Sequence, residues 1–223
     1  MPRPTLAPNG VIGLLVPWGN TTTQLEVEPL TPPGVCNAVG RFDFGPGVDL
    51  EAELRAVADK LTYTEPSAML VSLSPELRAG GLALARSLRA LVEEASGLPT
   101  CTTTEGTIWE LGRQNITTIG LITPTPAEGA DTTAAAFEAE GFTVAARLGM
   151  NCGLSNIKAT SLEDIAAALH AVDTPAVEAL VQVGTGLPAF AVATQVQTET
   201  GKPVITSGAA GYRQILHSLR GAP

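Results

Sequence analysis

The sequence has few charged residues, few aromatic residues and almost no histidine, and these shortages exclude several classes of protein. Charged residues make up 16% of the chain and hydrophobic residues 44%, so the chain is not a disordered segment. The 22 acidic residues outnumber the 13 basic ones, the net charge is −9, and lysine and arginine form no cluster. A nucleic-acid partner is therefore not expected. With only two histidines, a three-histidine metal site is impossible.

Long hydrophobic runs and regularly spaced cysteines are also missing. Apolar stretches such as Val11–Val16 are far shorter than the ~18 residues of a membrane span. The first ten residues are proline-rich and lack the apolar core of a signal peptide, so we expect a cytoplasmic protein with no membrane partner. The three cysteines (Cys36, Cys101 and Cys152) are odd in number and widely spaced, which predicts neither a disulfide framework nor a metal site.

Short apolar runs alternate with amphipathic stretches along the chain, and this alternation predicts an α/β fold with parallel sheets. Most of the runs are continuous in Val, Ile and Leu, as strands buried on both faces are. The predicted strands are Val11–Val16, Val35–Phe44, Ala68–Leu73, Pro99–Thr103, Ile119–Ile122, Thr143–Leu148, Ala179–Val183 and Pro203–Thr206.

Capping residues place the starts of the helices between these strands. Ser74-Pro75 predicts a helix reaching about Glu94, with Gly97 closing it, and Thr125-Pro126-Ala127-Glu128 reads as a capping box. Further helices are predicted after Asp49 and Ser161, over Pro188–Thr200 and over Ala209–Leu219.

The two halves of the chain resemble each other in three segments that occur in the same order. VIGLLVPWGNTT at 11–22 is similar to TIGLITPTPAEG at 118–129, and AMLVSLSPEL at 68–77 is similar to EALVQVGTGL at 178–187. GLPTCTTTEGTIWEL at 97–111 is similar to GKPVITSGAAGYRQIL at 201–216. This repeat predicts two pseudo-symmetric, doubly wound lobes, residues 1–114 and 115–223, which exchange an end helix. Ligands bind at the carboxyl ends of such strands, so we expect one shared cleft between the lobes.

Small residues with hydroxyl or amide groups follow most of the predicted strands. Helices begin directly after them, and helix N-termini supply free N–H groups and about half a positive charge. Together they predict a site for a carboxylate that needs no lysine or arginine, although any one of them could be an ordinary helix cap. These residues are Asn20, Thr21, Thr22, Ser74, Thr102–Thr104, Thr123, Thr125, Thr185, Thr206 and Ser207.

The segment VIGLLVPWGNTTTQLE resembles the first strand and loop of the maleate cis–trans isomerases, whose hallmark is VP-x-x-NTT. The rest is similar to the related arylmalonate decarboxylases of the aspartate/glutamate racemase superfamily, with EEASGLPTCTTT and GKPVITSGAAGYRQIL in the expected order. The resemblance covers about residues 11–220. It implies two similar α/β lobes with the active site between them.

The resemblance also implies residue roles, and two of the expected residue types are missing. The superfamily uses one or two catalytic cysteines, one from each lobe, just after the second strand of the lobe. At these positions the present chain has Ser74 or Pro75 and Gly184, and a tyrosine expected in the second lobe is Thr125. The chain therefore departs from the superfamily at both catalytic cysteines.

Other residues match the pattern that the resemblance implies for substrate binding. Asn20 corresponds to an isomerase asparagine that holds a substrate carboxylate, and Thr185 and Gly186 offer N–H groups to a second carboxylate. Trp18 occupies a variable position from which it could line the pocket or serve as an interface residue.

Glu76 is the acid that could replace the thiols, because it follows the Ser74-Pro75 corner at the predicted cleft. Burial would raise its pKa and let it exchange a proton, although an acid in a first helical turn is also favoured by the helix dipole alone. The candidate catalytic residues are therefore Glu76 and Ser74. The candidate binding residues are Trp18, Asn20, Thr125, Gly184, Thr185 and Gly186.

Three functions are compatible with these residues. The first is a cofactor-independent lyase or isomerase, most simply a decarboxylase, that forms an ene-diolate-type intermediate from a small carboxylate or dicarboxylate. The second is a hydrolase or hydratase in which Glu76 activates a water in the space left by the thiol. The third is a carboxylate-binding protein without catalysis. The expected partner is a small carboxylate substrate. The sequence is compatible with a homo-oligomer and does not decide the oligomeric state.

Overall fold

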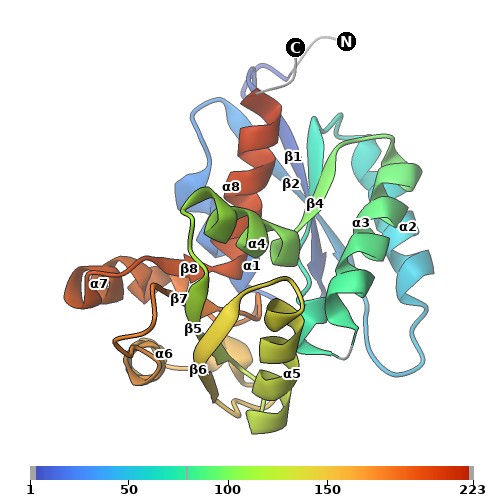
Figure 1. Cartoon of the computed structure of the whole chain (residues 1–223). Coiled ribbons are helices and arrows are strands. Elements are labelled where there is room, and N and C mark those ends of the chain that lie inside the picture. Colours follow the sequence, from blue (N-terminus) through green and yellow to red (C-terminus); the bar gives the residue numbers. More distant parts are fainter. Residues whose placement is uncertain (1–3, 79, 221–223) are drawn as a thin grey trace.

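The computed structural model describes residues 4–78 and 80–220, which form two four-stranded parallel sheets flanked by helices (Figure 1). The first sheet has the order β2-β1-β3-β4 and the second the order β6-β5-β7-β8. The two sheets therefore have the same topology, and the predicted α/β fold with two pseudo-symmetric lobes is confirmed. The strands are β1 (Gly10–Pro17), β2 (Val35–Phe42), β3 (Ala68–Val71), β4 (Thr100–Thr102), β5 (Thr118–Thr123), β6 (Thr143–Gly149), β7 (Ala179–Gln182) and β8 (Val204–Thr206).

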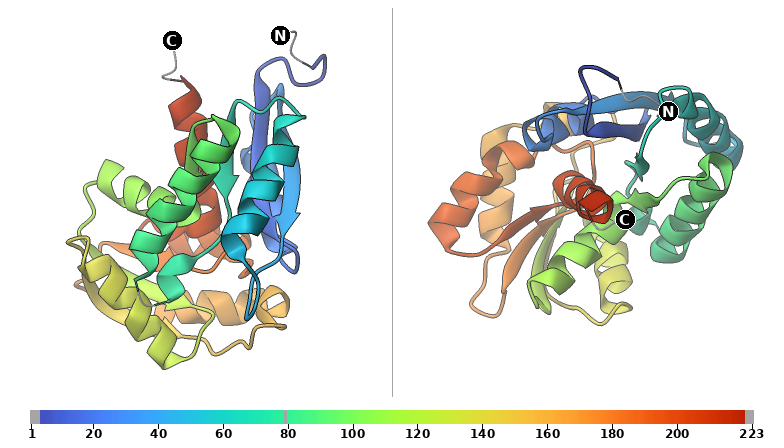
Figure 2. Two further views of the ribbon diagram at one scale, coloured as in Figure 1. Left: turned by 90° about the vertical axis from the view of Figure 1, so that its right-hand side faces the viewer. Right: turned by 90° about the horizontal axis from the view of Figure 1, so that it is seen from above.

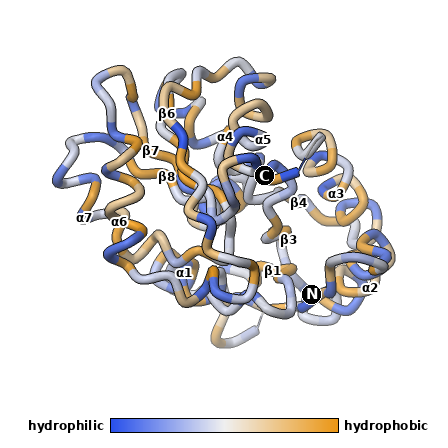
Figure 3. Tube along the Cα trace, turned by 90° about the horizontal axis from the view of Figure 1, so that it is seen from below, coloured by the Kyte–Doolittle hydropathy of each residue, from blue (hydrophilic) through white to orange (hydrophobic). Residues whose placement is uncertain are grey.

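The central strands of each sheet are buried along their length. Every residue of β1, β3 and β7 is buried, which explains their continuous apolar sequences. The edge strands β2 and β6 keep partly exposed residues. In Figure 3 the β1 and β3 traces are coloured mainly as hydrophobic, while both colours alternate along α2 and α3. The helices are α1 (Thr22–Val27), α2 (Leu50–Thr62), α3 (Gly81–Ser96), α4 (Thr103–Arg113), α5 (Ala127–Glu138), α6 (Leu162–Ala171), α7 (Phe190–Thr200) and α8 (Ser207–Arg220).

The registers of the two sheets define which residues of the lobes are equivalent. Ile12 of β1 lies opposite Ala68 of β3, and Ile119 of β5 lies opposite Ala179 of β7. Because the IGLL of β1 aligns with the IGLI of β5, Ala68 is equivalent to Ala179. Ser74 lies six residues after Ala68, and Thr185 lies six residues after Ala179, so Ser74 and Thr185 are equivalent. The sequence comparison had paired Ser74 with Gly184, so the structure moves that equivalence by one residue.

Each lobe completes its core with a helix from the other half of the chain. The α8 residues Tyr212 and Ile215 belong to the same buried cluster as Ile12 and Leu14 of β1. Leu111 of α4 belongs instead to the cluster of the second sheet. Figures 1 and 2 show α8 beside α4, close to the middle of the molecule. The predicted exchange of an end helix is therefore present, while the predicted boundary at residues 114/115 stays a prediction.

The exchanged helices approach closely because glycines face each other at their crossing. A Cβ atom added to Gly106 of α4 would lie 2.3 Å from the Cα atom of Gly211 of α8. Any side chain at Gly106 would force these helices apart, and with them the two lobes.

One predicted helix start and one predicted cap are wrong, and two predicted caps are confirmed. The Ser74-Pro75 corner opens only a single 3-10 turn, Pro75–Leu77, and α3 begins later, at Gly81. The Thr125 side chain does not cap α5, whose N-cap residue is Pro126. Asp49 and Ser161 do cap α2 and α6, by accepting hydrogen bonds from the backbone N–H groups three residues on.

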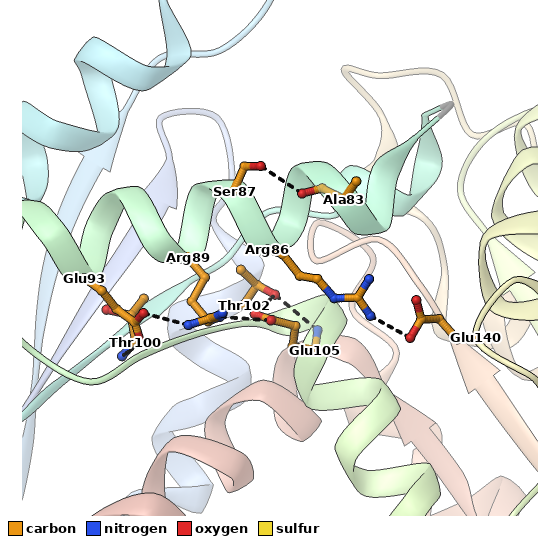
Figure 4. A network of polar contacts seen from close by, with 9 residues as sticks. All are labelled: Ala83, Arg86, Ser87, Arg89, Glu93, Thr100, Thr102, Glu105 and Glu140. Carbon is orange, nitrogen blue, oxygen red and sulfur yellow. Dashed lines mark hydrogen bonds and ion pairs between the residues drawn. The ribbon is translucent and has the colours of Figure 1, made fainter.

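A polar network holds α3 against the first turn of α4 (Figure 4). Arg89 of α3 pairs with Glu93 and with Glu105, at 2.6 and 3.0 Å. Thr102 also caps α4, because the backbone N–H of Glu105 donates to the Thr102 hydroxyl, and that hydroxyl donates to the Glu105 carboxylate. The Glu105 carboxylate is thus engaged in structure. Arg86 of α3 reaches Glu140 of the second lobe.

Among the described residues, no helix has the length and apolar character needed to cross a membrane.

Candidate active site

A cavity of about 510 Å³ lies at the carboxyl ends of the central strands, and residues of both lobes line it. The first lobe contributes Asn20 and Ser74, and the second contributes Thr125 and Thr185. Gly184 and Gly186 also line the cavity. The structure therefore brings together six of the eight residues that the sequence singled out. It does so because both sheets direct the carboxyl ends of their strands to this interface.

Asn20 is buried and connects the two lobes. Its amide Nδ2 donates to the Thr23 hydroxyl and to the Thr185 hydroxyl, both at 3.1 Å. Its Oδ1 accepts from the backbone N–H groups of Thr22 and Thr23, at 2.9 and 3.0 Å. Both amide hydrogens are thus used within the protein, so Asn20 orients the Thr185 hydroxyl and caps α1.

The hydroxyls of Ser74 and Thr185 are a pair that spans the interface between the lobes. The backbone N–H of Thr185 donates to Ser74 Oγ at 3.3 Å, and Thr185 Oγ1 accepts from Asn20. Within the described part of the chain, neither hydroxyl donates to another residue. Each hydroxyl oxygen already accepts a hydrogen bond, so each O–H proton is available to a ligand in the cavity.

Gly184 has a backbone conformation that a side chain would strain. Its φ is +109°, and an added Cβ atom would lie 2.6 Å from Cδ of Pro124. Gly184 lines the cavity, but it is not a position at which a cysteine side chain fits. The position equivalent to Ser74 is Thr185, as the strand registers show.

Thr125 contributes a third hydroxyl to the cavity. Its Oγ1 lies 2.6 Å from Oγ1 of Thr123, which is buried at the end of β5. This pairing leaves one of the two hydroxyl protons without a partner of its own, since the two oxygens share a single hydrogen bond.

Much of the remaining cavity wall is apolar, and its residues were not among the candidate site residues. This apolar part consists of Phe44, Leu50, Leu73, Leu77, Leu84, Leu154 and Ile157. Two cations, Arg78 and Lys158, also line it, whereas no aspartate or glutamate does within the described residues. Leu73 and Phe44 end two of the predicted strands, and the other residues lie in loops and near helix starts, where no local pattern marked them as part of a site.

Glu76 does not line the cavity. Its side chain is fully buried, its Oε2 accepts a hydrogen bond from the Thr104 hydroxyl, and its Oε1 has no partner among the described residues. Burial raises the pKa of Glu76 to about 7, and the bond from Thr104 opposes that rise. The geometry gives no support to Glu76 as a base that touches a ligand in this cavity.

A second buried acid, Glu26 of α1, was missed by the sequence analysis. Its Oε1 accepts from the backbone N–H of Phe190, the first residue of α7, at 2.8 Å. Burial raises the pKa of Glu26 to about 7, against the lowering effect of that bond. Glu26 therefore holds the second lobe against the first.

Trp18 lies outside the cavity wall. Its side chain is 60% exposed, while its neighbours Pro17 and Gly19 line the cavity. The structure thus does not place Trp18 with the binding residues.

The comparison with protein families decides the identity of the chain. Residues 58–221 match the family described as arylmalonate decarboxylase. The chain belongs to the arylmalonate decarboxylase family. The matched segment includes Ser74, Thr125 and Thr185 of the cavity. The comparison with curated proteins finds no match.

Solved structures of this family and of maleate isomerases share the fold. Unliganded arylmalonate decarboxylase superposes with a TM-score of 0.80 at 15% identity, covering 96% of this chain and 94% of that one. A cysteine-to-serine variant of Nocardia farcinica maleate cis-trans isomerase, with a covalently bound succinylcysteine intermediate, superposes with a TM-score of 0.85 at 21% identity. The match covers 95% of this chain and 93% of that one. The maleate isomerase Iso from Pseudomonas putida S16 superposes with a TM-score of 0.81 at 18% identity, and the match covers 95% of this chain and 93% of that one. These likenesses confirm the superfamily fold that the VP-x-x-NTT segment predicted.

None of the three cysteines of this family member lines the cavity. Cys101 is buried in β4, where its Sγ contacts the carbonyl of Gly211, and burial raises the pKa of its thiol. Cys36 is exposed on β2 and Cys152 is partly buried beyond β6. Among the described residues, no three histidine, cysteine or acidic side chains gather as a metal site would require.

Proposed function

We propose that the chain is a cofactor-independent decarboxylase of small malonate-type carboxylates, acting in the cavity between the lobes. One observation carries the proposal: two hydroxyls, Ser74 and Thr185, are held from opposite lobes with their protons free to point into a cavity that no acidic side chain of the described residues lines. Such donors bind a carboxylate, and the apolar wall suits an aryl or alkyl substituent. Membership of the arylmalonate decarboxylase family supports the same reaction class.

The reaction begins with one carboxylate of the substrate at the hydroxyl pair and the other against the apolar wall. The carbon–carbon bond to the second carboxylate breaks, carbon dioxide leaves, and the electron pair of that bond moves into the first carboxylate. The resulting ene-diolate carries more negative charge on its oxygens than the substrate carboxylate did. The hydroxyl of Thr185, fixed by Asn20, therefore stabilises this intermediate more than the ground state.

The reaction is completed when the carbon of the ene-diolate intermediate receives one proton. The Ser74 hydroxyl is the group placed for this step, because its oxygen is anchored by the N–H of Thr185 and its proton is not bound to any other described residue of the protein. Ser74 gives its proton to the carbon and regains one from water, so that the net reaction consumes one substrate and one proton and releases carbon dioxide. In this proposal, serine and threonine take the positions at which the superfamily pattern has thiols.

The other hypotheses fit the cavity less well. A thiolate isomerisation needs a cysteine at the substrate, and no cysteine lines this cavity. A hydratase or hydrolase that uses Glu76 needs that carboxyl group in the cavity, and its side chain lies outside the wall. A carboxylate-binding protein without turnover would use the same groups, and only an activity measurement separates it from a decarboxylase.

The test is to incubate the protein with phenylmalonate and, separately, with maleate, and to follow both by NMR and carbon dioxide release. The proposal expects phenylacetate and carbon dioxide from phenylmalonate, with no loss of rate after treatment with iodoacetamide. Fumarate formed from maleate, with inhibition by iodoacetamide, would overturn it in favour of an isomerase. Calorimetric binding of phenylmalonate with no product after prolonged incubation would overturn it in favour of a binding protein.

A further inference from the structure

One cation from each lobe also lines the cavity. Arg78 follows the 3-10 turn of the first lobe, and Lys158 lies in the turn Ile157–Ala159 of the second. Both side chains line the cavity, and both residues are exposed, so they lie on its solvent side. In a chain with net charge −9, a cavity lined by two cations and by no acid in the described residues is a local reversal of charge.

Among the described residues, neither of the two cations has an acidic partner, whereas five other cations do. Arg55, Arg86, Arg89, Arg147 and Lys202 each form an ion pair with a carboxylate. Within the described residues, no such pair involves Arg78 or Lys158. Arg78 is held from another side, since its guanidinium lies 6.0 Å from the centre of the Phe44 ring. That contact keeps the charge beside the cavity wall.

Apolar side chains of the cavity wall lie next in sequence to Ser74 of the hydroxyl pair and to both cations. Leu73 and Leu77 flank the first-lobe corner that carries Ser74, and Ile157 precedes Lys158 in the second lobe. A ligand that uses all of these groups therefore carries one anion for the hydroxyl pair, an apolar part for the wall and a second anion for the cations. The cavity volume of about 510 Å³ lies in the range of ordinary small-molecule sites, which admits a ring as the apolar part.

We propose that Arg78 and Lys158 form a subsite for a distal anionic group, so that the preferred substrate is a malonate-type acid whose apolar arm ends in a carboxylate or sulfonate. The part of this inference that concerns the reaction at the hydroxyl pair rests on the proposed function. The binding of the distal anion does not depend on it. Because the cations come from opposite lobes, the distal group would also bridge the two walls of the cavity mouth.

The test compares calorimetric binding of three ligands: phenylmalonate, 4-carboxyphenylmalonate, and the neutral methyl ester of its ring carboxylate. The wild type is expected to bind 4-carboxyphenylmalonate about fivefold or more tightly than its ring ester, which is the scale of two partly exposed ion pairs. The quantity compared is this ratio of the two affinities. This ratio should fall towards one in Arg78→Gln and in Lys158→Gln, and it should fall with added salt. Lys60→Gln, which removes an exposed lysine of α2, is the matched control and should keep the wild-type ratio.

The outcomes separate this inference from the proposed function. A wild-type ratio near one, or a ratio that survives both substitutions, overturns the subsite whether or not carbon dioxide is released. A ratio that depends on Arg78 and Lys158 supports the subsite even when no ligand is turned over, and in that case the decarboxylase proposal alone fails.

Discussion

At the scale of single residues, the site depends on which hydroxyl of each lobe faces the other. The sequence placed Asn20, Ser74, Thr125 and Thr185 at strand ends, and the structure brings all four to one cavity. It could not place the second-lobe equivalent of Ser74, because repeat segments of weak similarity can be aligned one residue apart. Only the strand register resolves that choice, and it selects Thr185 over Gly184.

This choice predicts different outcomes for cysteine at the two neighbouring positions. Gly184→Cys should destabilise the protein, because a Cβ atom there would lie 2.6 Å from Pro124 at a φ of +109°. Thr185→Cys should fold normally and present a thiol to the cavity. Thermal melting and labelling by a thiol reagent, both in a Cys36→Ser, Cys152→Ser background, measure the two effects. Equal melting temperatures for the two variants would show that the register-based equivalence is wrong.

Two of the buried acids, Glu26 and Glu76, predict how stability depends on pH. Burial raises the pKa of both Glu26 and Glu76 to about 7, from 4.5, so the folded state holds their protons more tightly than the unfolded state does. The stability gained from this is fully present below pH 4.5 and is lost as the pH rises through 7. The free energy of unfolding should therefore fall between pH 5 and pH 8.

A neutral replacement of both acids is the direct check on that slope. In the double variant Glu26→Gln, Glu76→Gln, urea unfolding at several pH values should show a flatter profile than in the wild type. Glu51→Gln, which changes an exposed acid of α2, serves as the control and should keep the wild-type slope. An unchanged slope in the double variant would mean that these carboxyls are ionised in the folded protein at pH 5.

At the scale of elements, the strands followed the sequence pattern closely and the helix starts less so. Continuous apolar runs predict buried strands because both faces of a parallel strand are covered. The Ser74-Pro75 signal was misleading because Pro75 starts a single 3-10 turn, after which Gly80, at a φ of +71°, redirects the chain into α3. That turn is what carries Ser74, Leu77 and Arg78 to the cavity wall.

Helix α8 should contribute to the stability of the first lobe, although it comes from the end of the chain. Tyr212 is fully buried, and its hydroxyl contacts Oγ1 of Thr31 at 2.9 Å and donates to Oδ1 of Asn37 at 2.8 Å. Tyr212→Phe should therefore lower the free energy of unfolding by about 0.5–1.5 kcal/mol, the net scale of a hydrogen bond, since the partly buried Thr31 and Asn37 each lose one contact. Tyr63→Phe, which alters an exposed tyrosine, is the control in urea unfolding. An unchanged midpoint in Tyr212→Phe would show that the hydroxyl bonds contribute nothing net.

At the scale of the whole molecule, the internal repeat predicted two lobes that share a cleft, and the structure has them. The repeat could not predict the apolar wall or the cations of the cavity, because Phe44, Arg78 and Lys158 lie in segments that differ between the lobes. The shared fold of the lobes thus places the hydroxyl pair. The unshared loops form the part of the cavity that would select a substrate.

The central claim is that the hydroxyl pair stabilises the intermediate of a decarboxylation, and the rate of carbon dioxide release from phenylmalonate tests it most directly. Thr185→Val removes the hydroxyl that Asn20 orients and keeps the shape of the side chain. The account predicts a loss of roughly 100-fold in kcat, the scale for one donor to a developing oxyanion. Thr198→Val, an exposed position on α7, should keep the wild-type rate. A wild-type kcat in Thr185→Val would contradict the account.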